Sequence, residues 1–247
     1  MRIAVISDIH SNVYALDEVL VDIQKRNIDM IVCTGDLVGY ATRPNEVIQT
    51  IKKEKILTIM GNYDDAIGNF KIICGCDYPD PKDAEKAGLS MHFTGQNTTD
   101  ENKAYLRNLP KDAILTFNNK TIRFVHGSTR IINEYLKENS IQADEVMGEL
   151  NEDILVCGHT HIPYAKYYGE KLLVNAGSVG KPKTNNSNAN YVIIDINNGD
   201  ELAKKDSSVE VEIIEVPYDF EKIAKEIEES EILPNDFARL IREGSSK

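Results

Sequence analysis

The sequence repeats one pattern, in which a short apolar run ends in side chains that can bind a metal ion. The run Ile3–Ile6 leads to Asp8 and His10, and the run Met30–Cys33 leads to Asp36. Three later runs, at 56–60, 121–125 and 154–157, end in the same way. The full set of groups is Asp8, His10, Asp36, Asn62, His126, His159 and His161. Four of the five histidines of the chain belong to it, which exceeds what packing requires and predicts a metal centre.

The donor atoms of this set are oxygen and nitrogen, so a closed structural zinc site built on thiolates is not expected. Imidazole, carboxylate and carbonyl ligands suit Mn, Fe, Zn, Co or Ni, and we favour Mn among these divalent or trivalent ions. Seven groups are too many for one tetrahedral ion and suit two ions that share a carboxylate, with Asp36 as the natural bridge. Asp8 and His10 are two residues apart, so in extended backbone they would point the same way and reach one ion.

Two ions opposite two carboxylates leave an excess of positive charge, which lowers the pKa of a bridging water and attracts phosphate oxygens. Asn62 is a neutral ligand and preserves that excess. The pattern therefore predicts a dinuclear centre that can activate water and bind a small phosphorylated molecule, with Asp36 and Asn62 as candidate catalytic residues.

The elements that position these groups alternate between strand and helix. The apolar runs have the length and the Val and Ile content of strands. Residues 14–26 have helical spacing with Asn12 as a cap, and residues 44–53 form a second helix with Pro44 in its first turn. This alternation predicts an α/β fold with parallel strands, in which ligands bind beyond the carboxyl ends of the strands.

The rest of the chain predicts a helical insertion and a C-terminal hairpin. Residues 66–118 interrupt the strand pattern and are expected to form a helical cap within a single domain, 1–247. A hairpin is expected from strands at 191–196 and 209–216, joined by a polar loop at 197–208. Two helices should follow, at 220–229 and at 234–244.

Charge and cysteine usage limit the partners and the compartment. The formal net charge is −12, and no block of Lys and Arg breaks the acidic balance, so nucleic acid and anionic membranes are not expected partners. The start of the chain does not resemble a signal peptide, and no apolar run has the length of a membrane span. Cys33 and Cys157 read as core thiols, and Cys74-Gly75-Cys76 reads as a loop that could otherwise grip a metal or oxidise. We therefore expect a cytoplasmic protein, with a homo-oligomer left open.

Five motifs resemble those of the calcineurin-like metallophosphoesterases in order and spacing. They are D-I-H at 8–10, G-D at 35–36, G-N at 61–62, H-G at 126–127 and G-H-T-H at 158–161. G-D-L-V-G-Y at 35–40 and N-A-G-S-V-G-K-P at 175–182 are similar to a small prokaryotic branch of phosphodiesterases, which includes proteins similar to diadenosine tetraphosphate hydrolases. The resemblance runs from Met1 to about Tyr218.

The resemblance implies a four-layer αββα sandwich of two mixed sheets flanked by helices. It implies one metal ion held by Asp8, His10, Asp36 and His161, and another held by Asp36, Asn62, His126 and His159. It also implies that a bridging hydroxide attacks phosphorus in line. Dinucleoside polyphosphates and other nucleotides are candidate substrates.

Tyr63 departs from the family pattern, which often has a histidine after the asparagine to protonate the leaving group. A phenol with a pKa near 10 is a poor proton donor at neutral pH, although it could hydrogen-bond a phosphate oxygen or simply pack. We therefore expect phosphodiesters or phosphoanhydrides with good leaving groups to be preferred. A phosphomonoesterase is one alternative, and a metal-binding interaction scaffold with little activity is another.

Other charged residues near the motifs are further candidates. His92, in the helical stretch 84–93, could reach the substrate or could pack in the cap. Arg43, Arg130, Lys181 and Lys183 could bind further phosphates, although single charges are more often solvated. Asp64 could support His10.

Overall fold

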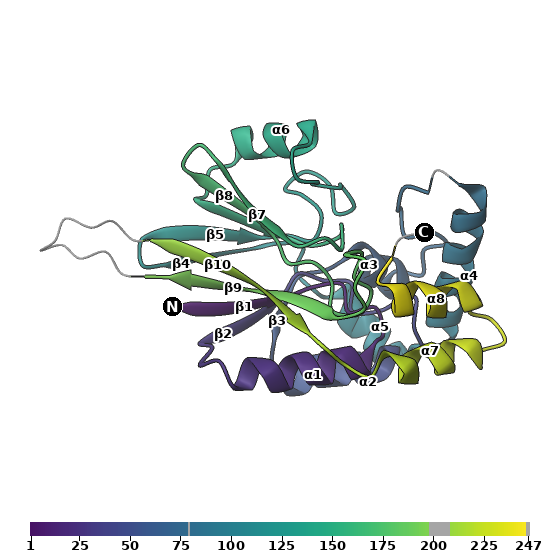
Figure 1. The fold of residues 1–247 in the computed structure, drawn as a ribbon. Helices are drawn as coiled ribbons and strands as arrows, with labels where there is room; N and C mark the ends of the chain where they lie inside the picture. The colour runs from purple at the N-terminus through teal and green to yellow at the C-terminus, as the bar shows by residue number, and fades with distance from the viewer. Residues whose placement is uncertain (79, 198–207, 246–247) are drawn as a thin grey trace, which may run out of the picture.

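Two five-stranded mixed sheets form the centre of the molecule, and helices cover their outer faces (Figure 1). The computed structural model describes residues 1–78, 80–197 and 208–245. The first sheet contains, in spatial order, β10 (Val209–Val216), β9 (Ala189–Ile196), β1 (Arg2–Ile6), β2 (Met30–Cys33) and β3 (Leu57–Thr58). The second contains β4 (Ala113–Phe117), β5 (Lys120–Phe124), β6 (Ile154–Cys157), β8 (Lys171–Asn175) and β7 (Tyr164–Tyr168).

The four layers follow from where the apolar side chains lie. Between the sheets, Ile3 and Val5 belong to one cluster with Phe124 and Val156 of the second sheet. A larger cluster joins the first sheet to α1 (Val13–Gln24), α2 (Pro44–Lys53), α7 (Phe220–Glu228) and α8 (Asn235–Glu243). A third cluster lies under α6 (Ile141–Glu149) on the other outer face. The predicted αββα sandwich is confirmed.

Local sequence explains the helices of the first sheet. In α1 the side chains at Leu16, Val19, Leu20 and Ile23 are buried on one stripe, as their spacing predicts. The Asn12 side chain accepts a hydrogen bond from Ala15 N and caps the helix. Pro44 begins α2, where its missing N–H costs nothing.

Strand pairing places the metal motifs at one edge. β1 pairs in parallel with β2, and β5 pairs in parallel with β6, so the carboxyl ends of these strands point in one direction. β9 and β10 form the predicted antiparallel hairpin. Most of the predicted connecting loop, at 198–207, lies outside the described residues.

The region predicted as a helical cap is partly helical. It contains α4 (Pro81–Asn97) and α5 (Asp100–Arg107), whereas α3 (Asn62–Gly68) begins before it. Its last residues form β4, which pairs antiparallel with β5. The cap prediction was therefore wrong for 113–117, because a half-buried edge strand alternates too weakly to stand out. None of the described helices is long and apolar enough to cross a membrane.

Candidate metal centre

The candidate ligands lie in loops that follow parallel strands of both sheets. Asp8 and His10 follow β1, Asp36 follows β2, His126 follows β5, and His159 and His161 follow β6. The residues form two groups. The first contains Asp8, His10 and His161, and the second contains Asp36, His126 and His159. Within each group the possible ligand atoms lie within 4.8 Å of one another. Each group takes residues from both sheets and could hold a metal ion.

The loops are not extended, contrary to the prediction for Asp8 and His10. Their φ angles are 52° and 48°, and Asp36, His159 and His161 also have positive φ. β1 ends at Ile6, and the loop then pairs with the loop after β2: Asp8 N donates to Gly35 O at 2.9 Å and His10 N to Asp36 O at 3.0 Å. The two side chains therefore meet because neighbouring loops are bonded together, and not by strand alternation.

Two glycines allow the loops to approach each other. A Cβ atom at Gly61 would lie 2.2 Å from Asp36 Oδ1, and one at Gly158 would lie 2.0 Å from Ser7 Oγ. Any side chain there would push a carboxylate out of place. The glycine of the G-N motif, Gly61, thus packs closely against Asp36, and the glycine of the G-H motif, Gly158, packs closely against Asp8.

Backbone carbonyls orient three of the imidazoles. His10 Nδ1 lies 3.0 Å from Val38 O, His126 Nδ1 lies 2.8 Å from Thr34 O, and His161 Nδ1 lies 2.6 Å from Lys181 O. A carbonyl can only accept, so each Nδ1 carries a hydrogen and each Nε2 is the ring nitrogen that faces the centre. His10 Nε2 and His161 Nε2 face each other at 3.2 Å, as two ligands of one ion would.

The two aspartates each use one oxygen for structure and leave the other at the centre. Asp8 Oδ2 accepts from Ser7 Oγ at 2.5 Å and from His159 N at 2.9 Å. Asp36 Oδ1 accepts from Tyr63 N at 2.8 Å. Asp36 Oδ2 lies 3.7 Å from His10 Nε2 and 3.5 Å from His126 Nε2, so it is close to histidines of both groups.

Two buried polar atoms test whether the site fits metal ions. Asp8 Oδ1 and His159 Nε2 are buried and have no hydrogen-bond partner within the described part of the chain. An unsatisfied buried polar atom is costly. Both atoms belong to the groups defined above, so a bound cation would satisfy them, and the donor set fits divalent transition metals.

The charge states of these groups also suit ligation. Burial lowers the pKa of His161 to about 3 and holds the pKa of His159 well below its ordinary value. Burial would raise the pKa of Asp8, but the neighbouring imidazoles, His161 first, hold it well below the ordinary value. These residues are therefore in the deprotonated forms that metals bind. At His126 the charge of Asp36 outweighs burial and raises the pKa to about 9, so an ion there must displace a proton.

Asn62 and Asp64, in the first turn of α3, have different tasks. Asn62 Oδ1 lies 2.9 Å from His126 Nε2, beside the second group. Asp64 accepts from the backbone N–H groups of Asp36, Leu37 and Gly61, at 2.8, 2.9 and 2.9 Å. The prediction that Asp64 supports His10 was wrong; it fixes the loop that carries Asp36 instead.

A cavity of about 810 Å³ opens onto the centre. His10, Asp36, His159 and His161 contribute to its wall, together with Tyr63, Lys181 and Lys183. Lys181 is only 6% exposed, and burial, followed by the charge of Lys183, lowers its pKa to about 7.

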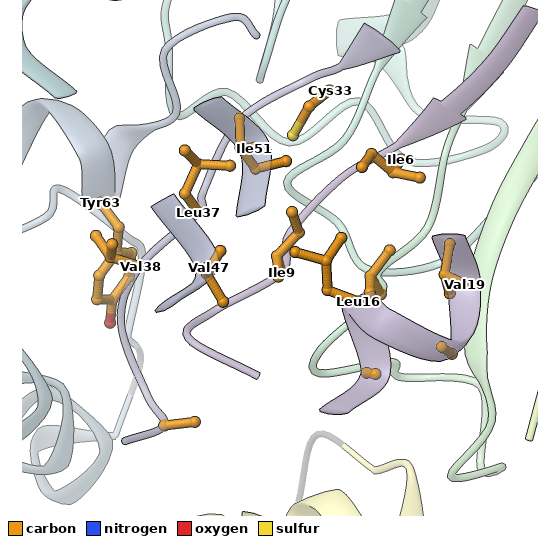
Figure 2. Close-up of a cluster of buried hydrophobic side chains, with 14 of the residues drawn as sticks. Ile6, Ile9, Leu16, Val19, Cys33, Leu37, Val38, Val47, Ile51 and Tyr63 are labelled. Atoms are coloured by element: carbon orange, nitrogen blue, oxygen red, sulfur yellow. The ribbon is translucent and has the colours of Figure 1, made fainter. Parts of the chain in front are cut away.

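Tyr63 is both a core residue and part of the cavity wall. It is fully buried, and Figure 2 shows its side chain among those of the hydrophobic cluster. The ring packs edge-on to His10, with 5.4 Å between centroids, and lies 4.9 Å from Tyr40. Burial, followed by the charges of Tyr40 and Tyr78, raises the pKa of Tyr63 well above its ordinary value, so the phenol is an even weaker acid than the sequence suggests.

Three predicted substrate or acid residues lie away from the cavity wall. His92 is exposed on α4, whose buried face carries Ala87, Ser90, Met91 and Thr94. Arg43 donates to Glu226 of α7 at 2.7 Å, and Arg130 donates to Glu134 at 2.6 Å. The structure therefore does not bring these three residues to the cavity. The carboxylate partners of the two arginines and the exposed position of His92 depend on tertiary packing, which the sequence does not show.

The sequence interpretation did not assign site roles to several residues that line the cavity. They are Tyr40, Tyr78, Tyr135, Lys137 and Cys76. Tyr40 had a usable signal, because it stands in the G-D-L-V-G-Y loop four residues after Asp36. The other four come from loops of irregular sequence, where no periodicity indicates which side chain faces inward.

Comparisons with known proteins agree with this geometry. The family model of the calcineurin-like phosphoesterase superfamily domain matches residues 1–199. The uncharacterized protein MJ0912 of Methanocaldococcus jannaschii is 32% identical over 242 residues, which cover 91% of each chain. Phosphodiesterase YfcE of Escherichia coli K12 is 23% identical over 220 residues, covering 85% of this chain and 95% of YfcE.

A solved structure shares the fold. The hypothetical protein PH1004 of Pyrococcus horikoshii OT3 superposes with a TM-score of 0.81 at 23% identity, covering 100% of this chain and 99% of PH1004. At that identity the likeness speaks for the fold alone.

Proposed function

Because the chain belongs to the calcineurin-like phosphoesterase superfamily, and is thus a hydrolase acting on phosphoester bonds, we propose that it cleaves phosphodiesters or phosphoanhydrides with two metal ions. The observation that carries the proposal is the pair of buried groups of His and Asp side chains, each drawn from both sheets. One ion would be held by Asp8, His10, Asp36 and His161. The other would be held by Asp36, Asn62, His126 and His159.

The bound ions would supply an activated water shared between them, together with positive charge for the phosphate oxygens. Manganese is our first choice of ion, followed by iron, zinc, cobalt and nickel. The chain itself contributes the orientation: carbonyls hold His10, His126 and His161 in the ligating tautomer. Asp64 holds the Asp36 loop through three N–H groups, so little reorganisation is needed when substrate binds.

The charges around the cavity support a polyanionic substrate. Lys137, Lys181 and Lys183 line it, and none of them makes an ion pair with a carboxylate within residues 1–78, 80–197 and 208–245. Lys86, also in the wall, is instead neutralised by Asp83 and Asp236 at 3.1 and 2.7 Å. Three lysines without carboxylate partners line a cavity of nucleotide size, and a bound phosphate would favour their charged forms. They suit a substrate with more than one phosphate, such as a dinucleoside polyphosphate.

The character of Tyr63 supports good leaving groups. Alkoxides need a proton as they depart, whereas phosphates and aryloxides leave readily without one. The residue that follows Asn62 is here a buried phenol of raised pKa. Phosphoanhydrides and activated diesters should therefore react faster than alkyl monoesters. The relationship to YfcE, whose name records a phosphodiesterase, agrees with this preference.

The test is turnover of three substrates by the purified protein with manganese, with and without chelator. The substrates are diadenosine tetraphosphate, an aryl phosphodiester and the matching aryl monoester. We expect chelator-sensitive turnover in which the tetraphosphate or the diester exceeds the monoester. A faster monoester would leave the metal centre standing and make the enzyme a phosphomonoesterase.

A series of monoesters with rising leaving-group pKa tests the role assigned to Tyr63. The rate should fall by more than about tenfold across the series, because no group protonates the departing oxygen. A smaller fall would indicate that another acid acts. Metal binding without turnover of any substrate would instead favour an interaction scaffold.

The cysteines bear on the cellular compartment. All four cysteines are free thiols, which suits the reducing cytoplasm that we propose. The proposed partner is the small phosphorylated substrate, and the oligomeric state is open.

A further inference from the structure

The loop between α3 and α4 places two thiols beside the candidate metal centre. Cys74 Sγ and Cys76 Sγ lie 3.1 Å apart, and both are free. Cys74 is buried, whereas Cys76 is half-buried and lines the cavity. Neither thiol is a proposed metal ligand or a proposed catalytic group.

This loop decides which end of the Asn62 amide faces the metal group. Asn62 Nδ2 donates to Cys74 O at 3.1 Å and to Cys76 Sγ at 3.2 Å. The oxygen end is thereby turned to His126, whose Nε2 lies 2.9 Å from Asn62 Oδ1. The two ends of an amide have nearly the same shape, so only hydrogen-bond partners select between them.

The residue between the two cysteines permits the sulfurs to come closer. Gly75 has a φ of +78°, a conformation that other residues rarely adopt. The carbonyl of Gly75 accepts from Asn133 Nδ2. A covalent bond between the sulfurs would draw Cys76 Sγ toward Cys74 and away from Asn62 Nδ2.

We propose that Cys74 and Cys76 form a site of reversible oxidation by peroxides, and that the disulfide releases Asn62 and weakens metal binding at Asp36, His126 and His159. The inference rests on the proposed role of Asn62 as a ligand. Cys76 faces the cavity and so meets the oxidant first.

The chemistry balances with hydrogen peroxide as the oxidant. The Cys76 sulfur attacks one peroxide oxygen, the O–O bond breaks, and the other oxygen leaves as water with the thiol proton. The Cys74 sulfur then attacks the Cys76 sulfur, the S–S bond forms, the S–O bond breaks, and a second water leaves with the proton of Cys74. Two thiols lose two electrons in total, and a dithiol reductant returns them.

The test uses the full-length protein loaded with zinc, which has no redox chemistry of its own. After treatment with equimolar hydrogen peroxide, the zinc content is measured and the protein is digested with trypsin. The tryptic peptide 72–82 contains Cys74 and Cys76 and neither of the other cysteines. We expect this peptide to become lighter by about 2 Da through loss of two hydrogens. We also expect the zinc content to fall by about one ion per chain, and dithiothreitol to reverse both changes.

Cys74→Ser is the matched control. It retains the Cys74 carbonyl and the Cys76 sulfur that Asn62 uses, so zinc content and turnover before treatment should equal those of the unmodified protein. Peroxide cannot remove two hydrogens from its peptide 72–82, and the treated variant should keep its zinc. Cys33 and Cys157 are fully buried and should stay reduced throughout.

Two results would overturn the proposal. A peptide 72–82 of unchanged mass, or one that only gains oxygen, would show that the two thiols do not pair. A disulfide that forms without loss of zinc would show that the loop does not control Asn62. Peptide mass does not depend on turnover, so it separates failure of this inference from failure of the proposed hydrolysis.

Discussion

Tyr63 directly follows a proposed metal ligand, yet its side chain belongs to the hydrophobic core (Figure 2). Its hydroxyl lies 3.4 Å from the Tyr78 hydroxyl, a long contact. The ring contacts both His10 and Tyr40, which also contact each other. Most of what this residue contributes is therefore ring packing, and its hydroxyl is available only to a group that enters the cavity.

Replacement of Tyr63 separates these contributions. Tyr63→Phe retains the ring, so kcat/KM for the aryl diester should stay within about threefold, because only a weak hydroxyl contact is lost. Tyr63→His introduces a group whose pKa lies near neutrality, so turnover of alkyl monoesters should rise relative to aryl monoesters. The measurement is the slope of log(kcat/KM) against leaving-group pKa. A loss above tenfold in Tyr63→Phe would instead assign the hydroxyl a direct contact with substrate.

Lys181 should matter for substrates with several phosphates. Its ammonium group lies over the Tyr40 ring, 4.7 Å from the centroid, and faces the cavity without a carboxylate partner among the described residues. In Lys181→Gln, KM for diadenosine tetraphosphate should rise about tenfold or more, equivalent to about 1.4 kcal/mol of lost binding. KM for the smaller diester should change less.

Lys86→Gln is the control for Lys181, since it makes the same charge change on the same cavity wall. Ion pairs with Asp83 and Asp236 hold Lys86, so it is not free to contact a phosphate, and its loss should raise KM less than the loss of Lys181. Equal effects of the two variants would mean that Lys181 acts only through the general field of the cavity.

At the residue scale the sequence predicted the chemical type of the site better than the places of individual side chains in the fold. The seven proposed ligands were found because they follow apolar runs, a local signal. The contact of Arg43 with Glu226 was not predictable, because Glu226 is 183 positions away in the sequence. Cys76 was read as part of a plain loop, because nothing local shows that its sulfur meets Asn62.

The loops after β1 and β2 show where periodicity stops being informative. Alternation predicts the direction of side chains only while the chain is extended, and Asp8, His10 and Asp36 all have positive φ. The convergence of these residues was nevertheless predictable, because parallel strands deliver their carboxyl ends to one edge. The conformation of the loops was not predictable, because it depends on hydrogen bonds between loops that are far apart in sequence.

Helix α7 is fastened to the start of α2 and to α1 through one carboxylate. Glu226 accepts from Tyr14 Oη at 2.6 Å, from Thr42 Oγ1 at 2.5 Å and from Arg43 Nη2 at 2.7 Å. Burial would raise the pKa of Glu226, but the hydrogen bonds from Arg43, Thr42 and Tyr14 lower it to about 2. The ionised form is thus the one that holds these elements together.

Glu226→Gln should lower the free energy of unfolding by about 1–2 kcal/mol at pH 7, since four hydrogen bonds from Tyr14, Thr42 and Arg43 lose a charged acceptor that is partly screened by solvent. A depressed pKa stabilises the fold above the ordinary value of 4.5, and this contribution is lost as the pH falls toward about 2. Urea unfolding of both proteins from pH 7 downward should therefore show a difference that shrinks below about pH 4.5.

Glu229→Gln is the control for that experiment. Glu229 is exposed at the end of the same helix and makes no ion pair in the part of the chain that the structure describes. Its replacement should leave stability unchanged at every pH. A difference between Glu226→Gln and the unmodified protein that persisted at low pH would show that shape, and not charge, holds α7.

At the scale of the whole molecule, the two sheets are joined by two unlike contacts. Apolar side chains such as Val5 and Phe124 join them along their facing surfaces. At the carboxyl ends of the strands, polar groups from both sheets meet instead. The layered architecture was predictable from the resemblance and from the strand–helix alternation. The pairing of β4 with the second sheet was not predictable, because the sequence of an edge strand does not identify its neighbour.

Metal ions at this junction should stabilise the whole fold, because each proposed ion binds residues of both sheets. An ion present at 100 times its Kd adds about 2.7 kcal/mol to the free energy of unfolding. For a chain of this size, 1 kcal/mol corresponds to about 2–4 °C in Tm, so chelation should lower the Tm by several degrees. Calorimetry before and after dialysis against chelator measures the shift.

Two histidine variants show whether the shift comes from the proposed centre. His159→Ala removes a ligand of the group with Asp36 and His126, and it should reduce the chelator-induced shift by about half, since one of two linked sites is lost. His92→Ala removes an exposed histidine on α4 and should leave the shift intact. If both variants respond to chelator as the unmodified protein does, the ions that stabilise the fold bind elsewhere. If the unmodified protein does not respond at all, the two sheets are held by their apolar contact alone, and the polar junction serves binding and catalysis without contributing to stability.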